Sequence, residues 1–420
     1  MNLYQELKFR GLIYQISNDN LVDELNSEGF FTVYAGFDPT ASSFHVGHLL
    51  QLCLLKRFAQ LNHKIVVLIG GATGLIGDPS GKTTERPLLD EDTVARNVES
   101  LKCQIETLFG SDLEKISVVN NLDWWANLNV TSFFREVGKY VTVNQMLARE
   151  SVKKRIENPD AGISFAEFSY MLLQAYDYLY LFDNYGVNLQ VGASDQWGNI
   201  VQGIDLIRRI RNTESPRGLT TPLLTKSDGQ KFGKSESGTV WLDANLTSPY
   251  ELYQFFYKTE DTSVISYLKY FTFVSTDEIT QLENEQKTNP KERLAQKTLA
   301  YEVCKMVHGQ TIANEAKTSS ESIFKESVEE MDIENLISKV PTKTLAFNQV
   351  IGISVEALAL LAELTASKGE AKRLVSQGGL YLNNIRINDS KEIRQDDLIM
   401  DKYLILRAGK TKQLVVELLK

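Results

Sequence analysis

Two of the four histidines in this 420-residue chain lie in one pentapeptide, FHVGH, at His45 and His48. Their spacing suits three kinds of site: a metal site, a pair of partly buried core histidines, or a phosphate site. A metal ion needs further ligands, and His63 and His308 are the remaining histidines, although carboxylates are plentiful. Phosphate binding is favoured by Gly47, which lets a ligand approach the backbone, and by the helical run that follows, whose first N–H groups attract anions. The pentapeptide alone leaves all three alternatives open.

A glycine-rich segment, GGATGLIGDPSGK, places Lys82 after an apolar, strand-like run. The segment departs from the phosphate-loop pattern of nucleoside triphosphatases, because its upstream glycine is Gly77 where the pattern needs a glycine in place of Ile76. A phosphate loop of that type is therefore disfavoured. A phosphate contact and a solvated turn both stay open for Lys82.

A second basic segment, TKSDGQKFGKS, carries Lys226, Lys231 and Lys234 among glycine and serine. Few apolar anchors and many small residues make such a loop costly to order. Two lysines three positions apart on it can close over a polyphosphate and neutralise the charge that develops there. The alternative is a solvated basic loop without a ligand.

The segment YMLLQAYD places Tyr170, Gln174 and Asp177 at helical spacing, so that they project from one helix face. On a helix that is otherwise apolar, such a polar stripe faces either solvent or a pocket. Tyr, Gln and Asp supply the donors and acceptors that bind an ammonium group and a phenol.

The apolar runs around these segments predict a parallel α/β sheet. Strands are predicted in FFTVYAGFD, KIVVLIGG, ISVVNN and VNLQVGASDQWGN, and helices in VGHLLQLCLLKRFAQLNHK, in residues 163–182 and in NIVQGIDLIRRI. Ligand sites in such sheets lie at the carboxyl ends of the strands, so we expect the chemistry in the turns that follow them. Residues 246–325 are predicted to be helical.

Composition indicates a soluble globular protein, with 43% hydrophobic and 24% charged residues. The three cysteines, Cys53, Cys103 and Cys304, form no CxxC pair, which is typical of a thiol-reducing compartment and argues against a zinc site of that type. No apolar run is long enough to span a membrane and the N-terminus is unlike a signal peptide, so we expect a cytoplasmic protein. The net charge is −9, but residues 351–420 carry 11 Lys+Arg against 9 Asp+Glu, so a local patch there can still bind RNA.

Taken in order, these segments resemble the class I aminoacyl-tRNA synthetases, and among them the bacterial tyrosyl-tRNA synthetases. FHVGH is similar to the signature His-Ile-Gly-His, with Val46 for isoleucine, and KFGKS to Lys-Met-Ser-Lys-Ser, with Phe232 and Gly233 substituted as in the bacterial tyrosyl enzymes. YAGFDPTA, GDPSGK, YMLLQAYD and GASDQWGN resemble the tyrosine and adenylate segments of that family. Each motif is weak alone, whereas six in order are strong, and the resemblance runs essentially end to end.

The resemblance implies a two-step reaction. The carboxylate of L-tyrosine attacks the α-phosphorus of ATP, which gives tyrosyl-adenylate and pyrophosphate, and a ribose hydroxyl at the 3′ end of tRNA(Tyr) then takes the tyrosyl group. Positioning and charge stabilisation are expected to dominate the first step. Mg²⁺ is expected to arrive with ATP, with no tightly bound cofactor and no dedicated protein metal site.

By the same resemblance, the residues that stabilise the phosphates are His45, Thr40, Lys82, Arg86, Lys231 and Lys234, and His48 contacts the nucleotide ribose. The wider set of implied ATP-binding residues is Gly36, Asp38, Thr40, His45, Gly47, His48, Gly192, Asp195, Lys234 and Ser235, with Asp195 at the adenylate ribose. Ala35 and Ala193 stand where some relatives carry Cys and Gly, so the ATP contacts there are expected to differ.

For the amino acid, the resemblance implies Tyr34 and Asp177 at the substrate phenol oxygen. It places Tyr170, Gln174 and Asp78 at the ammonium group and Gln196 at the carboxylate end. A pocket with buried Tyr34 and Asp177 would leave both unpaired if phenylalanine entered, so no editing domain is expected.

The C-terminal segment SKGEAKRLVSQGGLYLNNIRIND resembles the αL RNA-binding motif. Ser367 is predicted as an N-cap and Glu370 as its capping-box partner. Lys368, Lys372 and Arg373 then cluster on the first turns as an RNA-binding surface, with a solvated basic face as the alternative. Gly378 and Gly379 are predicted to end the helix before the strand LYLNN.

Three other functions fit parts of the chain. A tryptophanyl-tRNA synthetase shares the architecture, but Asp177 and the αL tail favour tyrosine. A nucleotidyltransferase that uses a His-x-Gly-His loop would lack the RNA-binding tail. A non-enzymatic RNA-binding regulator would not need to keep His45, His48, Lys231 and Lys234.

The predicted organisation is a Rossmann-like parallel-sheet catalytic domain that binds tyrosine and ATP, a helical anticodon-side domain, a linker and a small α+β RNA-binding domain of the αL type. Their predicted boundaries are 1–245, 246–325, 326–350 and 351–420. A homodimer is expected from the family, with its interface in the aromatic region that contains WW and FFREVGKYV, although the same aromatics fit a core.

Overall fold

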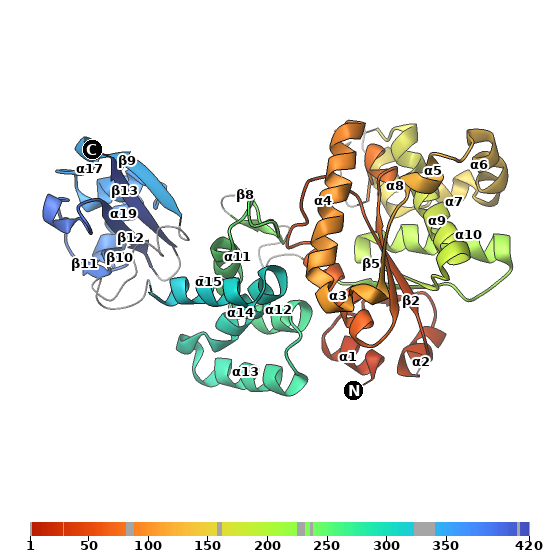
Figure 1. The fold of residues 1–420 in the computed structure, drawn as a ribbon, viewed down its shortest axis with the longest axis horizontal. Helices are drawn as coiled ribbons and strands as arrows, with labels where there is room; N and C mark the ends of the chain where they lie inside the picture. The colour runs from red at the N-terminus through yellow and green to blue at the C-terminus, as the bar shows by residue number, and fades with distance from the viewer. Residues whose placement is uncertain are drawn as a thin grey trace. The chain divides into compact units, whose positions relative to one another are not determined.

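The structure is a computed structural model that describes residues 2–27, 29–80, 88–157, 162–224, 232–235, 238–322, 341–409 and 412–419 (Figure 1). The chain forms two compact units. Unit 1 comprises Met1–Asp243 and Thr262–Thr288, and unit 2 comprises Ala244–Asp261 and Asn289–Lys420. The residues predicted as one helical domain are thus divided between the units, and the other predicted boundaries stay predictions.

Unit 1 is built on a six-stranded sheet with the order β1-β6-β5-β2-β3-β4, in which β1 is antiparallel to β6 and all other neighbours are parallel. The strands are β1 (Gln15–Ile16), β2 (Thr32–Phe37), β3 (Lys64–Ile69), β4 (Ile116–Asn120), β5 (Leu189–Ala193) and β6 (Arg217–Thr221). The four predicted strands are confirmed as β2 to β5. Two strands of this sheet were not predicted: β1 is only two residues long, and the β6 sequence RGLTT lacks an apolar run.

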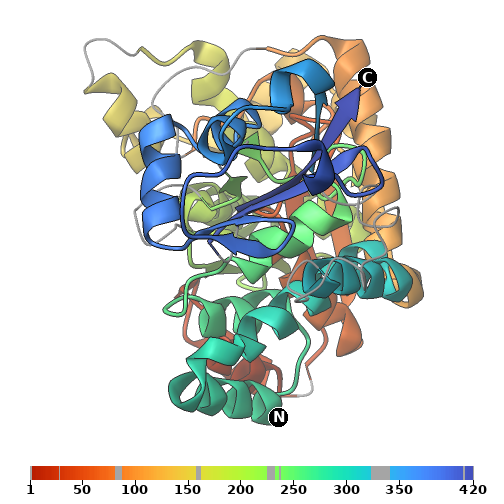
Figure 2. The ribbon, with the colours of Figure 1, turned by 90° about the vertical axis from the view of Figure 1, so that its left-hand side faces the viewer.

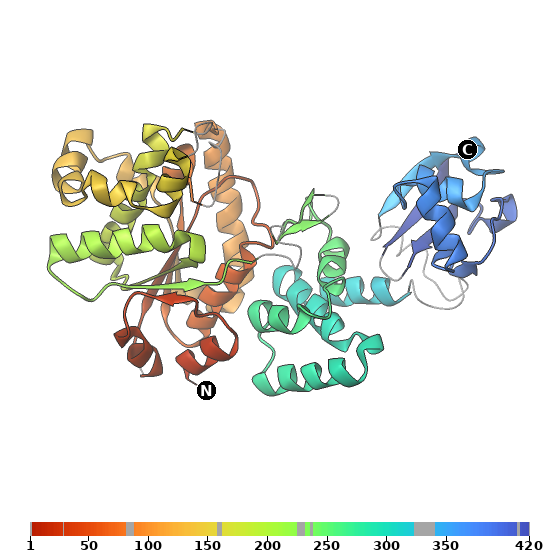
Figure 3. The ribbon, with the colours of Figure 1, turned by 180° about the vertical axis from the view of Figure 1, so that it is seen from behind.

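Helices cover both faces of this sheet, with α3 and α4 on one side and α9 and α10 on the other (Figures 1 and 3). The helices of unit 1 are α1 (Leu3–Phe9), α2 (Asn20–Asn26), α3 (Leu49–Gln60), α4 (Glu91–Phe109), α5 (Leu122–Trp125), α6 (Val130–Glu136), α7 (Val143–Leu147), α8 (Glu150–Ile156), α9 (Phe165–Tyr185), α10 (Trp197–Arg211), α12 (Val264–Phe271) and α13 (Thr276–Thr288). Shorter elements are the 3-10 turns η1 (Thr73–Leu75), η2 (Gly110–Lys115), η3 (Gly138–Tyr140) and η4 (Ser194–Gln196) and the hairpin β7 (Lys234–Ser235) and β8 (Gly238–Thr239). Burial on both faces explains why β2 and β3 are almost continuously apolar.

The strand order reverses direction at β2. The chain runs from β2 outward to β3 and β4, and then returns to the other side of β2 to form β5 and β6. Connections leave β2 and β5 over opposite faces, so the carboxyl ends of these two strands border a crevice, which is where such sheets bind ligands. This switch point brings together the turns after residues 37 and 193.

The helix α9 carries the polar stripe predicted from YMLLQAYD. Ser164 caps its first turn by accepting the Glu167 N–H, and Gly186 ends it with a left-handed φ of +67°. Between these caps the helix packs Tyr178 and Leu181 into the core of unit 1. The predicted helix over 163–182 is therefore confirmed, with its end three residues later.

Unit 2 contains a helical segment and a small sheet (blue in Figure 2). The helical segment has α11 (Pro249–Tyr257), η5 (Pro290–Glu292), α14 (Leu294–His308) and α15 (Gln310–Ser322). The sheet has the order β11-β10-β12-β13-β9 and consists of β9 (Thr342–Ala346), β10 (Leu380–Leu382), β11 (Ile385–Ile387), β12 (Tyr403–Ala408) and β13 (Lys412–Leu419), with the helical elements α17 (Phe347–Val350), α18 (Val355–Leu361), α19 (Lys368–Ser376) and η7 (Gln395–Asp397). Residues 342–350 belong to this sheet and not to a linker, because β9 pairs in parallel with β13 and Val350 is buried in its core.

Candidate active site

The two histidines of FHVGH stack on each other just before α3. Their ring centroids are 3.8 Å apart and the rings are tilted by 17°. Gly47 makes this possible, because a Cβ at its position would lie 2.7 Å from Cε1 of His45. Phe44 and Phe37 pack edge-on against His48. The pair is thus neither solvated nor fully buried, and both rings are half-buried at the start of a helix.

Backbone hydrogen bonds determine which nitrogen carries the proton on each ring. Nδ1 of His45 accepts the Gly47 N–H (3.0 Å), and Nδ1 of His48 accepts the His45 N–H (3.3 Å). A neutral imidazole that accepts at Nδ1 holds its proton at Nε2. In this neutral form each ring has an N–H at Nε2 that can donate to a phosphate or ribose oxygen.

A fully buried carboxylate, Asp177 of α9, lies at one end of the predicted amino-acid pocket. Its Oδ1 accepts the indole N–H groups of Trp124 (2.8 Å) and Trp125 (2.7 Å), and its Oδ2 accepts the amide of Asn121 (3.0 Å). Burial raises the pKa of Asp177 to about 7, although these three hydrogen bonds act to lower it. The carboxylate is thus held at a point where a further donor would shift it to the ionised form.

Tyr34 is a β2 residue that is only 1% exposed, and its ring lies 5.8 Å from that of Tyr178. Burial, and next the charge of Asp177, raises the pKa of Tyr34 well above its ordinary value. Its hydroxyl stays protonated and can donate or accept a hydrogen bond. Tyr34 and Asp177 are therefore both buried, and the carboxylate is near enough to affect the pKa of the Tyr34 hydroxyl. Their predicted role as a phenol-binding pair stays a prediction.

A polar group formed by Asp38, Thr73 and Tyr170 is joined to Asp177 by hydrogen bonds through Asn121. The Tyr170 hydroxyl donates to Oδ2 of Asp38 (2.8 Å), and the Thr73 hydroxyl donates to Oδ1 (2.7 Å). Asn121 donates to Thr73 as well as to Asp177, so one network joins the two carboxylates. Asp38 was predicted only as an ATP contact. In the structure its carboxylate accepts a hydrogen bond from the Tyr170 hydroxyl.

A second polar group contains the remaining predicted amino-acid ligands. Nε2 of Gln196 donates to Oδ2 of Asp78 (2.7 Å), and Nε2 of Gln174 lies 3.3 Å from Oε1 of Gln196. Asn199 donates to the amide oxygens of both glutamines. Asp78 also accepts the backbone N–H of Ser80 (2.8 Å). These contacts join the side chains of Gln174, Gln196, Asn199 and Asp78 in one hydrogen-bonded group, in which Asp78 is the acidic member.

The other predicted nucleotide residues lie around the switch point. Gly36 is at the end of β2, and Thr40 is exposed in the turn after it, where its N–H donates to the Asp38 carbonyl (2.8 Å). Gly192 is the second-last residue of β5, and a Cβ at its position would lie 3.1 Å from Cβ of Gln196. Asp195 is exposed in η4. Lys82, Arg86 and Lys231 lie outside the described residues, and Lys234 and Ser235 are described only by their backbone in β7.

Residues that the sequence analysis missed complete the site: Thr73, Asn121, Trp124, Trp125 and Asn199. Asn121 is the last residue of the predicted strand ISVVNN, and Trp124 and Trp125 lie in α5, which follows it. The rule that ligands gather in the turns after parallel strands therefore pointed to them. Their aromatic character was instead assigned to a core or an interface.

In unit 2, Lys368, Lys372 and Arg373 lie on α19 and are all exposed. Ser367 caps the helix by accepting the Glu370 N–H (3.1 Å), as predicted. The Glu370 carboxylate, however, accepts the N–H of Ala366 (2.8 Å), one residue before the predicted partner. The predicted reciprocal capping box is therefore wrong in its second hydrogen bond. The Glu370 carboxylate accepts the N–H of Ala366 and not that of Ser367.

In the part of the chain that the structure describes, no group of three or more His, Cys, Asp or Glu side chains is arranged to hold a metal ion. Within that part, no helix has the length and apolar character needed to cross a membrane.

Comparison with known proteins gives matches over nearly the whole chain. Residues 26–325 match the family described as class I tRNA synthetases (W and Y), and residues 332–416 match a tyrosine–tRNA ligase C-terminal domain family. The chain is 45% identical over 416 residues to a tyrosine–tRNA ligase of Roseiflexus castenholzii, covering 97% of each chain. It is 44% identical over 422 residues to that of Geobacillus stearothermophilus, covering 99% of each.

Solved structures agree with these matches. A C-terminally truncated mitochondrial tyrosyl-tRNA synthetase of Aspergillus nidulans superposes with a TM-score of 0.70 at 34% identity, covering 77% of this chain and 94% of that one. A tryptophanyl-tRNA synthetase of Encephalitozoon cuniculi superposes with a TM-score of 0.54 at 17% identity, covering 74% and 87%, which shows a shared fold only.

Proposed function

Because this chain belongs to the class I tRNA synthetase family, as a member that joins tyrosine to tRNA, we propose that the pocket at the switch point binds L-tyrosine and ATP side by side. The observation that carries this proposal is the buried Asp177 with its three N–H donors beside Tyr34. A carboxylate oxygen has two lone pairs, so Asp177 can accept a further hydrogen bond from a substrate hydroxyl beside its three protein donors.

The proposed tyrosine contacts divide between the two ends of the pocket. Tyr34 and Asp177 bind the phenol oxygen. Tyr170, Gln174 and Asp78 bind the ammonium group, with the carboxylate of Asp78 supplying the charge. Gln196 lies at the carboxylate end and orients it for attack on ATP. Binding in this way lowers the barrier by fixing the attacking oxygen, without an acid or base on the protein.

ATP is proposed to lie over FHVGH, with the Nε2–H groups of the stacked histidines as donors. His45 and Thr40 stabilise the β- and γ-phosphates and His48 contacts the ribose, while Asp195 binds the adenylate ribose. Lys82, Arg86, Lys231 and Lys234 are proposed to neutralise the charge on the departing pyrophosphate. Gly36, Asp38, Gly47, Gly192 and Ser235 complete the proposed nucleotide site.

Mg²⁺ is proposed to enter with ATP, held by phosphate oxygens and water. The described residues offer no cluster of acidic or histidine ligands for it, so no protein ligand is assigned and no step depends on one. We further propose that the protein acts in the cytoplasm, which its free cysteines support.

The test of this function is amino-acid-dependent exchange of labelled pyrophosphate into ATP, run with each of the twenty amino acids. Exchange with tyrosine alone is the expected result. Exchange with tryptophan alone would replace tyrosine as the substrate, and no exchange would leave an RNA-binding role.

Tyrosine binding is expected to weaken below pH 7. The folded pKa of Asp177 is about 7, so its carboxyl is ionised above that pH and protonated below it. A substrate phenol that donates to the ionised form cannot donate to the neutral one in the same way, so the dissociation constant should rise about tenfold per pH unit below the pKa. Calorimetry between pH 5.5 and 8 in two buffers should also detect proton release on binding. A flat profile would contradict ionised Asp177 as the phenol acceptor.

The αL surface of unit 2 is proposed to bind tRNA. Replacing Lys368, Lys372 and Arg373 together by glutamate should leave pyrophosphate exchange intact and weaken tRNA charging at least tenfold, because each phosphate contact adds to affinity. All three are exposed, so folding should be unaffected. Deleting residues 341–420, which removes β9 with its sheet, should act in the same way. Full charging by either variant would refute the proposed role.

A homodimer is proposed, supported by apolar residues that are exposed in unit 1. Trp124 and Phe133 of the aromatic region are buried, whereas Phe134, Val143 and Phe165 are 50%, 60% and 73% exposed. Exposed apolar groups concentrated in one stretch are typical of an interface. Replacing Phe134 or Phe165 by glutamate should shift sedimentation toward the monomer, whereas Leu61→Glu, at an exposed position outside this stretch, should not. Equal shifts in all three would refute this placement.

A further inference from the structure

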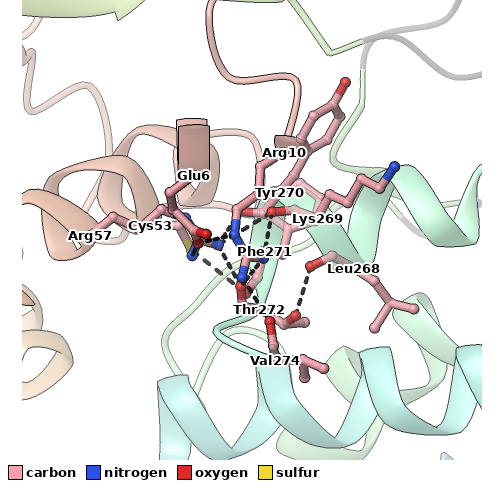
Figure 4. Close-up of polar contacts among 10 residues, drawn as sticks. All are labelled: Glu6, Arg10, Cys53, Arg57, Leu268, Lys269, Tyr270, Phe271, Thr272 and Val274. Carbon is pink, nitrogen blue, oxygen red and sulfur yellow. Dashed lines mark hydrogen bonds and ion pairs between the residues drawn. The ribbon is translucent and has the colours of Figure 1, made fainter. Parts of the chain in front are cut away.

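Two buried arginines enclose the C-terminal turn of α12 (Figure 4). Arg10, the C-cap of α1, is 2% exposed, and Arg57, on α3, is 3% exposed. Nη1 of Arg10 donates to the carbonyls of Lys269 (3.1 Å) and Thr272 (3.0 Å), and Nη2 of Arg57 donates to the same two carbonyls. Glu6 pairs with both guanidinium groups.

The two arginines provide hydrogen-bond donors for two of the last four carbonyls of α12. The last four carbonyls of a helix lack an intrahelical partner. In α12 the Leu268 carbonyl accepts hydrogen bonds from the N–H and the hydroxyl of Thr272. The carbonyls of Lys269 and Tyr270 accept hydrogen bonds from the arginine side chains. The last, that of Phe271, lies 3.7 Å from the Cys53 sulfur. The positive charges also face the negative end of the helix dipole, so the last turn of α12 is held firmly.

The turn held in this way supports the second signature motif. Phe232 of KFGKS is 8% exposed, and its ring stacks on Phe271 at 5.3 Å with a tilt of 14°. It also meets Tyr267 edge-on at 5.1 Å. Both partners lie on the last two turns of α12. The position of Phe232 therefore depends on where α12 ends.

Backbone contacts join the second signature to the first. A Cβ on Gly233, which has a φ of +97°, would lie 3.2 Å from Cγ2 of Val46 and 3.3 Å from the Gly47 nitrogen. The Gly233 carbonyl accepts the Val240 N–H (3.0 Å), and the Val240 carbonyl accepts the Val46 N–H (3.0 Å). A shift of the KFGKS backbone would therefore change its register with FHVGH.

Within unit 1 these contacts connect the two signature motifs through α3 and α12, so that the position of each element depends on the next. FHVGH leads into α3, α3 carries Arg57, Arg57 holds α12, and α12 holds Phe232 beside FHVGH again. We propose that Arg10 and Arg57 are positioning residues for adenylate formation, which act through α12 and Phe232 to keep the segment Phe232–Ser235 in register with His45 and Gly47. This inference rests on the proposed phosphate role of the two motifs.

Burying two like charges with one carboxylate is costly, and the free-energy cost is offset only by well-aligned carbonyls. Lysine cannot reproduce the arrangement, because its ammonium lacks the planar fork that reaches several carbonyls at once. A purely structural role would make Arg57→Lys destabilising without a selective effect on one step. A positioning role predicts a defect in the ATP-dependent step beyond any loss of stability.

The test measures single-turnover formation of tyrosyl-adenylate, tyrosine affinity and thermal unfolding for Arg57→Lys, Phe232→Leu and the double variant. Small misplacements of reacting groups can cost up to about 100-fold in rate. We expect each single variant to slow adenylate formation about tenfold, with tyrosine affinity changed less than twofold. The double variant should be about as slow as the slower single variant, because both act through one contact chain. The proposal would be overturned if the slowing in the double variant equalled the product of the slowing in the two single variants. It would also be overturned if the single variants formed adenylate at the normal rate.

Arg217→Lys provides the matched control. Arg217 is also buried and pairs with Glu24, but it contacts neither α12 nor Phe232 by the contacts described for it. It should lower the unfolding temperature without slowing adenylate formation, and equal slowing in both arginine variants would overturn the proposal. If Arg57→Lys fails to fold, Phe271→Leu combined with Phe232→Leu makes the same comparison.

His45→Ala separates this inference from the proposed function. If His45→Ala forms adenylate at the full rate, the phosphate role of FHVGH is wrong, and the inference falls with it. If His45→Ala is slow and Arg57→Lys is not, only the positioning role is wrong.

Discussion

Replacement of Asp177 by alanine should lower kcat/KM for tyrosine in pyrophosphate exchange by about 10³-fold, with little change in ATP affinity. The substitution removes the proposed phenol acceptor and also leaves the N–H groups of Trp124, Trp125 and Asn121 without the acceptor that they have in the folded protein. Asp177→Asn keeps an oxygen for the tryptophans and should lose about 10²-fold. Steady-state exchange with varied tyrosine and varied ATP measures both constants.

The control for Asp177 is a second aspartate on the same helix. Asp183 is exposed and pairs with Arg211 at the surface, so Asp183→Asn removes the same charge outside the pocket. It should exchange tyrosine normally. Equal losses for tyrosine and ATP in Asp177→Asn would point to a folding defect and would contradict a specific phenol contact.

The preference for tyrosine over phenylalanine should fall strongly in Asp177→Ala and Asp177→Asn. For tyrosyl-tRNA synthetases the discrimination is about 10⁵-fold without editing, a value established for this enzyme type and not obtained from this geometry. In the proposed pocket the physical reason is that phenylalanine would leave the buried Tyr34 hydroxyl and Asp177 carboxylate without the hydrogen bonds that a substrate hydroxyl supplies. Asp177→Ala removes the second of these costs.

Replacement of His45 or His48 by alanine should slow tyrosyl-adenylate formation by about 10²-fold to 10³-fold and leave tyrosine affinity nearly intact. Each ring is proposed to donate from Nε2 to charge or hydroxyl oxygens of ATP, and loss of one donor aimed at a transition state has this size. Stopped-flow measurement of the first turnover gives the rate, and equilibrium binding gives the affinity. Loss of tyrosine affinity in step with the rate would contradict the split between the two ligands.

His63 shows what a structural histidine looks like in this protein. It is 7% exposed, its Nδ1 accepts the Phe31 N–H (3.2 Å), and burial lowers its pKa. His63→Gln should reduce stability without slowing adenylate formation. If it slowed that step as much as His45→Ala does, a general loosening of the fold would explain both results.

Local sequence patterns predicted much of the fold and part of the site. Continuous apolar runs identified β2 to β5, and helical spacing identified α9 together with the face that carries Tyr170, Gln174 and Asp177. The same patterns missed β1 and β6, where pairing with a neighbouring strand replaces apolar character as the cause of the strand. They also missed residues 342–350, because β9 is ordered by β13, a strand some seventy residues later in the chain.

What the sequence determined by itself was the chemistry available: two histidines around a glycine, lysines on a small-residue loop, and a polar stripe on an apolar helix. Their residue types and spacing are local properties, so they can be read without a fold. Only the tertiary structure decided that Trp124, Trp125 and Asn121 surround Asp177, that Asp38 is bonded to Tyr170, and that Arg10 and Arg57 hold the helix beneath Phe232. These are contacts between segments 50 to 260 residues apart, and such contacts are created by burial in a common core, which no local pattern records.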